Sequence, residues 1–456
     1  MNSIKISAAL GTMLIPFIYN PKLPVMDMNY LAGSYDHAVV EQEKKDHDKS
    51  IIEERDSIDR WMREYVNGSF IPSAALVVIR DGAVWHRNLV NTSEKRRYSV
   101  ASFTKTFTAL AALQLVERGK MSLDEPVNNY YPAYLENDQL VTRQITLRDL
   151  LTHTSGIVND FSGPGRLYPY QRYPAGSRFY YSNQGYIVVG RIIEHVSGKP
   201  LYRYITEQFL EPLGMKDSVA PETMVASGGL QCTIDDLAKY AAMMLNRGST
   251  RFHTFVSEKT FNEIFSKTLD SPPVKFNEYR GISWRVWTID DRPYSMNHAA
   301  LWVGSGGWIQ LFPSLGVGYV FISDTPDHDS DEFNLFYRGL KGRLLKLTAL
   351  LSDSDMDPRG FNPGIPLGEE LKEFTGVYKN NERNRFIEIG LDKRGGLSVR
   401  RIESGEVMDI VPTSRLTFVY IYPGQSEKGL AFDFTWKKDS IVGLGVLDGY
   451  YEKISF

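Results

Sequence analysis

The 456-residue chain has very little cysteine, no recognisable metal-binding pattern and no concentrated positive charge. Its single cysteine, Cys232, excludes an internal disulfide. The eight histidines form no H-x-x-x-H or H-E-x-x-H pair, so the sequence predicts neither a catalytic metal nor a cofactor. Because the formal net charge is −3 and no basic block is present, nucleic acid is not an expected partner. A content of 42% hydrophobic and 23% charged residues excludes a disordered chain and favours a globular protein with more than one domain.

The N-terminus carries an apolar run over residues 6–19, directly after Lys5. This run has the charge and length of a signal peptide and is short for a membrane span. We therefore interpret residues 1–34 as a possible signal or anchor segment, with membrane contact only if this segment stays uncleaved. Export to the periplasm or the extracellular space is predicted, with a cytoplasmic location as the alternative, and the oligomeric state stays open.

Ser102 and Lys105 form an S-x-x-K motif at the expected start of a helix over residues 103–118. Apolar residues recur at helical spacing there, and Gly119 stands where a C-terminal cap belongs. Residues three apart share a helix face, so the hydroxyl and the amine should lie within reach of each other. The helix N-terminus would favour an oxyanion near Ser102, and desolvation would lower the pKa of Lys105. The motif predicts a nucleophile and its base.

Tyr181 and Asn183 belong to a second motif, which lies between a turn at residues 174–176 and a helix expected to end at Gly198. Since S-x-x-K also occurs by chance in a chain of this length, the second motif matters for the interpretation. Residues two apart share one side of an extended segment, so the phenol and the amide should face the same cleft. There the Tyr181 hydroxyl can move protons.

A third motif, residues 297–301, contains His298 and is followed by a glycine-rich stretch at 304–307 and a strand-like run. With these elements in this order, the chain resembles the serine beta-lactamase and penicillin-binding-protein superfamily. The resemblance is to the branch of class C beta-lactamases, D-aminopeptidases and family VIII esterases, whose motifs are S-x-x-K, Y-x-N and K/H-x-G. Further similar segments lie at residues 123–127, 150–156 and 211–215.

The resemblance implies that Ser102 attacks a carbonyl carbon to form an acyl-enzyme. It implies that Lys105 and Tyr181 act as general bases that share the proton transfers, and that Asn183 orients Lys105 and the substrate amide. These roles define a serine hydrolase with a small-molecule ester or peptide as its substrate.

The third motif would complete the site. The resemblance implies that His298 offers a cation or a hydrogen-bond donor to a substrate carboxylate or to the Tyr181 oxygen. It also implies an oxyanion hole made by the backbone N–H groups of Ser102 and Leu301. The sequence departs from the family pattern at Ala300, where the family has glycine, and the added methyl group can narrow the cleft or shift the Leu301 N–H.

Three other features have structural explanations. His153 follows an apolar stretch and is interpreted as support for the cleft rather than as a proton carrier. Cys232 precedes the capping signal at Thr233 and should pack in the interior. The glycine-rich stretch 304–307 lacks the Lys-Ser/Thr of a phosphate loop and should form a turn between strands.

The order of elements predicts an α+β fold in which an antiparallel sheet is flanked by helices and joined to a helical subdomain. Asp81-Gly82 signals a hairpin at the start of the sheet. Residues 35–50 read as a polar segment that leads into a helix from 51 to 65. Further helices are expected at residues 201–210, 233–245 and 333–350, with returning strands at 284–288 and 303–322.

A change in pattern divides the chain after this part. We assign residues 35–350 to a beta-lactamase-like domain, 351–366 to a linker and 367–456 to a small all-β barrel or sandwich. Five strands are expected in this last part, over residues 386–390, 397–402, 416–422, 430–436 and 441–447. Residues 375–378 resemble the start of the lipocalin-like domains that follow some members of the family.

The sequence supports a serine hydrolase that acts on an ester or on an amide or peptide containing a D-amino acid. His298 in place of lysine argues against an efficient beta-lactamase. A non-catalytic peptide-binding or assembly module, in which Ala300 has disabled the oxyanion hole, is the alternative from another class. A further variant keeps the acyl-enzyme but passes the acyl group to an alcohol or amine, as an acyltransferase does.

Overall fold

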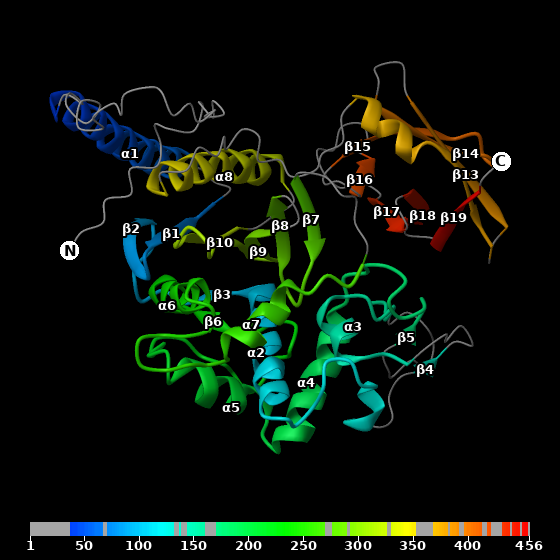
Figure 1. Ribbon diagram of the computed structural model, residues 1–456, viewed down its shortest axis with the longest axis horizontal. Coiled ribbons are helices and arrows are strands. Elements are labelled where there is room, and N and C mark those ends of the chain that lie inside the picture. The colour runs from blue at the N-terminus through cyan, green and yellow to red at the C-terminus, as the bar shows by residue number, and fades with distance from the viewer. Residues whose placement is uncertain are drawn as a thin grey trace, which may run out of the picture. The chain divides into compact units, whose positions relative to one another are not determined.

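A computed structural model gives the structure of the protein, drawn in Figure 1. Residues 1–50 and 51–456 form two compact units. Among the described residues, no helix combines the length and apolar character that a membrane crossing requires. The structure describes residues 37–66, 71–131, 136–137, 144–159, 170–269, 276–289, 292–325, 330–352, 368–381, 384–391, 396–412, 417–420, 431–437, 440–446 and 449–454.

An antiparallel sheet of seven strands in the order β2-β1-β11-β10-β9-β8-β7 organises the first part of the larger unit. The hairpin of β1 and β2 forms one end of the sheet, and β1 pairs over its whole length with β11, the last strand of this sheet in the sequence. This agrees with the predicted α+β class. The strands are β1 (Ser73–Arg80), β2 (Ala83–Val90), β7 (Phe276–Arg280), β8 (Arg285–Ile289), β9 (Arg292–Trp302), β10 (Ser305–Phe312) and β11 (Val317–Asp324).

The predicted hairpin at the start of the sheet is confirmed. Asp81 and Gly82, the two residues between β1 and β2, have φ values of 51° and 78°. Two successive positive φ values fit the twist of a two-residue hairpin, and Asp and Gly are residues that tolerate them.

The two faces of the sheet contribute to separate cores because side chains alternate along each strand. One face packs against α8 (Asp331–Leu351) and the second half of α1 (His37–Val66), as Figure 1 shows. The other face packs against the helical part of the molecule, including α2 (Thr104–Glu117) and α6 (Ile234–Leu245). The polar segment 35–50 was expected to lead into a helix, but α1 already begins at His37, since its Glu and Lys residues are good helix formers.

The helical part contains α2, α4 (Asn183–Ser197) and α6 together with shorter elements. Thr233 caps α6 by accepting a hydrogen bond from the Asp236 N–H, and Gly198 ends α4 with φ 69°, both as predicted. The other elements are β3 (Tyr98–Ser99), η2 (Ala101–Phe103), η3 (Val127–Asn129), β4 (Glu136–Asn137), α3 (Leu147–Leu151), β5 (Tyr170–Gln171), α5 (Leu201–Ile205), the π-helical turn η4 (Thr206–Leu210), β6 (Gln231–Cys232), α7 (Glu258–Asn262) and η5 (Glu263–Phe265).

A closed barrel of eight antiparallel strands, β12 to β19, follows after η7 (Gly368–Phe374). Its buried side chains, among them Phe374, Val399 and Leu444, form a core of their own. Five of the strands were predicted, while β12, β15 and β19 were not assigned. The strands are β12 (Gly376–Asn380), β13 (Arg385–Leu391), β14 (Leu397–Arg401), β15 (Val407–Pro412), β16 (Thr417–Tyr420), β17 (Ala431–Lys437), β18 (Ser440–Val446) and β19 (Gly449–Ile454).

Several predicted features lie outside the described residues. These are the possible signal segment 1–34 and nearly all of the linker 351–366.

Candidate active site

Ser102 sits in the short 3-10 turn η2, immediately before α2 begins at Thr104. The turn starts at Ala101, a non-glycine residue with φ 41°, so the backbone is held in the sparsely populated left-handed region. Strained backbone of this kind persists only where the surroundings fix it, and the neighbouring Val100 N–H is tied to the Leu230 carbonyl at 3.0 Å. Ser102 itself remains partly exposed, so its hydroxyl can meet a substrate.

Lys105 lies one helical turn beyond Ser102 and is completely buried. Its Nζ is 3.1 Å from Ser102 Oγ and donates a hydrogen bond to the Ser227 carbonyl at 2.8 Å. Burial lowers the pKa of Lys105 to about 7 from an ordinary value of 10.5. A neutral amine that donates to Ser227 keeps its lone pair available for the Ser102 proton.

Tyr181 reaches the same oxygen from the segment before α4, and its hydroxyl donates to Ser102 Oγ at 2.9 Å. Lys105 Nζ lies 5.0 Å from the centre of the Tyr181 ring. Desolvation of the phenol raises the pKa of Tyr181, while the bond to Ser102 and the charge of Arg280 oppose this rise. Tyr181 therefore holds its proton at neutral pH and is set up to pass a proton on rather than to remove one.

Asn183 does not take the expected place. It was predicted to share an extended segment with Tyr181 and to orient Lys105, but Ser182 is the extended N-cap of α4 and Asn183 is already the first helical residue. Among the described residues, its side chain makes no hydrogen bond to Lys105. The Lys105 amine is held by the Ser227 carbonyl instead, and the role of Asn183 at the substrate amide stays a prediction.

His298 projects from β9 toward the helical side of the sheet and is 8% exposed. Its ring lies nearly perpendicular to the rings of Phe103 and Trp284, at centroid distances of 6.3 and 6.4 Å. Nδ1 lies 2.7 Å from the Ala299 carbonyl, which can only accept, so Nδ1 carries the ring proton. Burial, assisted by the charge of Lys105, lowers the pKa of His298 to about 3. The ring is thus neutral and can offer Nε2 as an acceptor, but it supplies neither the cation nor the second donor that was expected.

The end of β9 lies beside the nucleophile turn η2. Pairing with β8 stops at Asn297, so among the described strands residues 298–302 pair only with β10 and leave their other edge open. Along such an edge alternate backbone N–H groups point outward, as an oxyanion hole at Leu301 requires. Ala300 is completely buried in the same core as Phe103, so its methyl group packs inward rather than into open space.

Two groups at this site were not found from the sequence. The Ser227 carbonyl, which holds Lys105, lies in a turn before Gly228 and Gly229, and no residue pattern identifies a backbone acceptor. Asn159 hydrogen-bonds the backbone around Tyr181 and lies beyond the Thr-His-Thr-Ser-Gly segment. In the sequence, only the proximity of Asn159 to that segment could have indicated a role at the site.

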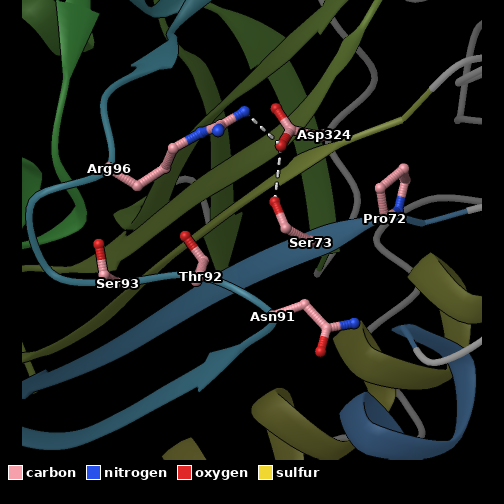
Figure 2. A pocket seen from close by; sticks show the side chains of 7 residues that line it. All are labelled: Pro72, Ser73, Asn91, Thr92, Ser93, Arg96 and Asp324. Carbon is pink, nitrogen blue, oxygen red and sulfur yellow. Dashed lines mark hydrogen bonds and ion pairs between the residues drawn. The ribbon is translucent and has the colours of Figure 1, made fainter.

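A polar depression, shown in Figure 2, lies at the other end of the segment that leads to the nucleophile. Asp324 accepts hydrogen bonds from Ser73 at 2.6 Å and from Arg96 at 2.8 Å, and the three side chains point toward one another. Since its charged groups pair among themselves, the depression fastens the loop after β2 to the sheet. A further bond from Ser305 to the Ser99 carbonyl, 2.7 Å long, fixes the chain just before Ser102.

This arrangement of a serine, a buried lysine and a tyrosine lies in a fold that is shared with solved structures. The structure matches the octameric penicillin-binding protein homologue from Pyrococcus abyssi with a TM-score of 0.52 and 21% identity, over 88% of this chain and 99% of that one. Residues 58–341 match the model of the family described as Beta-lactamase, and the chain belongs to that family.

Curated relatives match a shorter part of the chain. Protein flp of Staphylococcus aureus strain MW2 is 30% identical over 190 residues, which are 36% of this chain and 38% of flp. A protein of Escherichia coli K12 named "Putative D-alanyl-D-alanine carboxypeptidase" is 29% identical over 206 residues, which are 37% of this chain and 47% of that protein. The chain therefore spans less than half the length of these relatives.

Proposed function

We propose that the protein is a serine hydrolase that forms an acyl-enzyme on Ser102 and acts on an ester or on an amide or peptide containing a D-amino acid. The observation that carries this proposal is the meeting of Lys105 Nζ and Tyr181 OH at Ser102 Oγ, at 3.1 and 2.9 Å. Membership of the beta-lactamase family and the name of the Escherichia coli relative support the D-amino-acid substrate class.

The proposed acylation step begins with the Lys105 amine in its neutral form. Its lone pair takes the proton of the Ser102 hydroxyl while Oγ forms a bond to the substrate carbonyl carbon. The carbonyl oxygen becomes an oxyanion held by the N–H groups of Ser102 and Leu301. As the intermediate collapses, the bond to the leaving oxygen or nitrogen breaks, and Tyr181 gives that atom a proton which Lys105 replaces.

Deacylation would reverse these roles. Water enters the cleft, gives one proton to the Lys105–Tyr181 pair and attacks the acyl carbon. The bond to Ser102 Oγ then breaks and the proton returns to that oxygen. The net reaction consumes one water and yields a carboxylic acid with an alcohol or amine. If an added alcohol or amine replaced water in this step, the protein would be an acyltransferase.

Covalent labelling tests the proposal most directly. A fluorophosphonate or penicillin probe should label the wild type at Ser102 and fail to label Ser102→Ala. A panel of p-nitrophenyl esters, nitrocefin and D-alanyl-p-nitroanilide then separates esterase, lactamase and aminopeptidase activity. Hydrolysis that survives in Ser102→Ala would refute the assignment of the nucleophile, and added methanol that raises product formation would indicate transfer.

The non-catalytic alternative rests on Ala300, where the family has glycine. If wild type failed to label and Ala300→Gly restored labelling, the chain would be a peptide-binding or assembly module with a disabled oxyanion hole. The assignment to the class C-like branch, the lipocalin-like nature of the barrel and export of the protein are likewise proposals, based on the motifs, on residues 375–378 and on residues 1–34.

A further inference from the structure

The backbone around Tyr181 is held by a loop that is distant in sequence. The Tyr180 N–H donates to the His153 carbonyl at 2.8 Å, and the Ser182 N–H donates to His153 Nδ1 at 3.0 Å. The Tyr181 carbonyl accepts from Asn159 Nδ2 at 2.9 Å. The backbone on both sides of Tyr181 is therefore fixed by two side chains and one carbonyl of the segment 153–159.

His153 also supports the Tyr181 side chain. The two rings lie 4.4 Å apart between centroids and are inclined by 32°. The imidazole also packs against Tyr186, at a centroid distance of 5.0 Å, and against Phe179, whose ring is nearly perpendicular to it at 5.8 Å. Aromatic rings at these distances attract one another and restrict rotation, so the imidazole limits where the Tyr181 hydroxyl can go.

The protonation state of His153 suits an acceptor. Since Nδ1 accepts from the Ser182 N–H, the ring proton must be on Nε2, which has no hydrogen-bond partner within the described part of the chain. Burial, reinforced by the charges of Lys105 and Arg280, holds the pKa of His153 well below its usual range. The ring therefore stays neutral and keeps this acceptor across the working range of pH.

His153 adopts a costly backbone conformation in this position. Its φ is 60°, in the left-handed region that non-glycine residues seldom occupy. A buried donor without a partner adds a further cost. Both costs are typical of a residue kept for what it positions rather than for the stability it provides.

Asn159 completes the arrangement from the other end of the segment. Its Oδ1 accepts from the N–H groups of Asn183 at 2.8 Å and Gln184 at 3.3 Å, which are the first two residues of α4. A side-chain oxygen at this place satisfies N–H groups that have no partner within the helix. The same amide thus ties the Tyr181 carbonyl to the start of α4.

We propose that His153, together with Asn159, is a positioning residue that sets the Tyr181 hydroxyl against Ser102. The inference rests on the proposed function, because positioning matters only if Tyr181 transfers protons. Neither side chain touches the reacting oxygen. They act through Tyr181, and a displacement of about 1 Å at a reacting group can cost about 100-fold in rate.

Substitutions at His153 separate its two contributions. His153→Asn keeps an acceptor at the Nδ1 position and tolerates positive φ but loses the ring, whereas His153→Phe keeps the ring and loses the acceptor. With a p-nitrophenyl ester, each variant should lower kcat by about 10- to 100-fold and leave KM within about threefold. His153→Ala should lose the most, and His153→Asn should recover part of that loss.

A double-mutant cycle with Tyr181→Phe tests whether His153 acts through Tyr181. In the Tyr181→Phe background, His153→Phe should reduce the fluorophosphonate labelling rate by less than about twofold further, because the group that it positions is already absent. If the losses multiply instead, or if KM rises while kcat stays unchanged, the inference is wrong. Should Tyr181→Phe label too slowly to measure, the comparison of kcat with KM decides alone.

Two controls separate this outcome from other failures. His253→Asn makes the equivalent change at an exposed histidine and should leave kcat unchanged. Each variant is checked by thermal unfolding. If a His153 variant is unfolded at the assay temperature, its kcat loss is discarded and Asn159→Ala is measured instead. Asn159→Ala should also lower kcat and leave KM nearly unchanged. Failure of the wild type to label at Ser102 would refute the proposed function itself, whereas normal labelling with an unaffected His153→Phe and Asn159→Ala would refute only the positioning role.

Discussion

Burial of the Lys105 amine sets the pH at which this side chain can act as a base. With a pKa of about 7, caused by desolvation, the amine is an ammonium ion at pH 5 and has a free lone pair at pH 8. Only the neutral form can take the Ser102 proton. His298 and His153 are already neutral over this range, so they do not impose a second transition.

The expected pH dependence follows directly. The kcat/KM for ester hydrolysis should rise about tenfold per pH unit below pH 7 and level off above it, because the fraction of neutral Lys105 limits the rate. Initial rates between pH 5 and 9 measure this, with circular dichroism at each pH to show that the protein remains folded. A flat profile in that range would show that Lys105 is not the base.

Lys105 and Asn183 differ in how far their positions relative to Ser102 could be predicted from the sequence. Helical spacing was sufficient to place Lys105 beside Ser102, because one turn of helix brings positions i and i+3 together. The expectation for Asn183 relied instead on the alternation of an extended segment, and it failed because α4 starts at that residue, where the Ser182 side chain and Asn159 accept hydrogen bonds from the first turn. Bonds between residues more than twenty positions apart leave no periodic signal in a single sequence.

At the scale of elements, α2 is unusual because it buries a lysine on a helix that is enclosed on nearly all sides. The unfolded chain would hold that proton up to pH 10.5, whereas the folded protein releases it near pH 7. Between these values the unfolded state binds more protons, so stability increases as pH rises from about 7 to 10.5. Below pH 7 the full cost of burying the charge applies, and it corresponds to roughly 5 kcal/mol.

Lys105→Met should therefore stabilise the protein while it abolishes catalysis. Removing the charge recovers up to roughly 5 kcal/mol at pH 6, and the loss of a partner for the Ser227 carbonyl costs about 1–3 kcal/mol. We expect a net gain of about 2–4 kcal/mol at pH 6 and little or none at pH 10, measured by urea unfolding. Lys120→Met, at an exposed lysine just beyond the same helix, should change little at either pH. An equal gain at both pH values would contradict the explanation.

The loop that carries His153 and Asn159 depends on Gly156. This residue has φ 76°, and an added Cβ would lie 1.8 Å from the Tyr173 carbonyl oxygen, against which the loop is packed. Gly119 has a similar φ of 66° at the end of α2, but an added Cβ there would meet no atom within 4 Å. The two glycines therefore share a backbone conformation and differ in the space around it.

Gly156→Ala should cost at least about 3 kcal/mol of stability, because it adds a backbone clash to the strain of a positive φ. Gly119→Ala should cost only about 1–2 kcal/mol, from the strain alone. Urea unfolding of both variants measures the difference. Gly156→Ala should also lower kcat, because the displaced loop carries the groups that hold Tyr181. Equal costs at the two glycines would show that the loop adapts.

At the scale of the whole molecule, the sequence predicted those strands and turns whose local residue pattern is pronounced. The hairpin at Asp81-Gly82 and the alternating strand β17 were predicted because turn chemistry and a period of two are local properties. Strands β12 and β19 were missed because two polar residues interrupt the apolar pattern of each, and β15 was missed because it ends at Pro412. Closure of the barrel depends on β12 pairing with β19, about seventy residues apart, which no local pattern records.

The separate core of the barrel leads to the last prediction. Its buried residues, from Leu371 to Tyr451, form one cluster, while the two clusters that cover the faces of the sheet use residues up to Leu351. A group of side chains that buries its own apolar surface can fold as a unit, and the boundary between such units is where proteases cut first.

Limited proteolysis of the full chain should therefore cleave within residues 353–367 and give two resistant fragments, identified by mass spectrometry. The larger fragment should still be labelled at Ser102 by a fluorophosphonate at a rate within about threefold of the intact protein, because Ser102, Lys105 and Tyr181 are all held by elements before residue 352. Cleaving Ser102→Ala in parallel controls for labelling elsewhere. Loss of labelling on cleavage, with the larger fragment still folded by circular dichroism, would show that the barrel contributes to the active site.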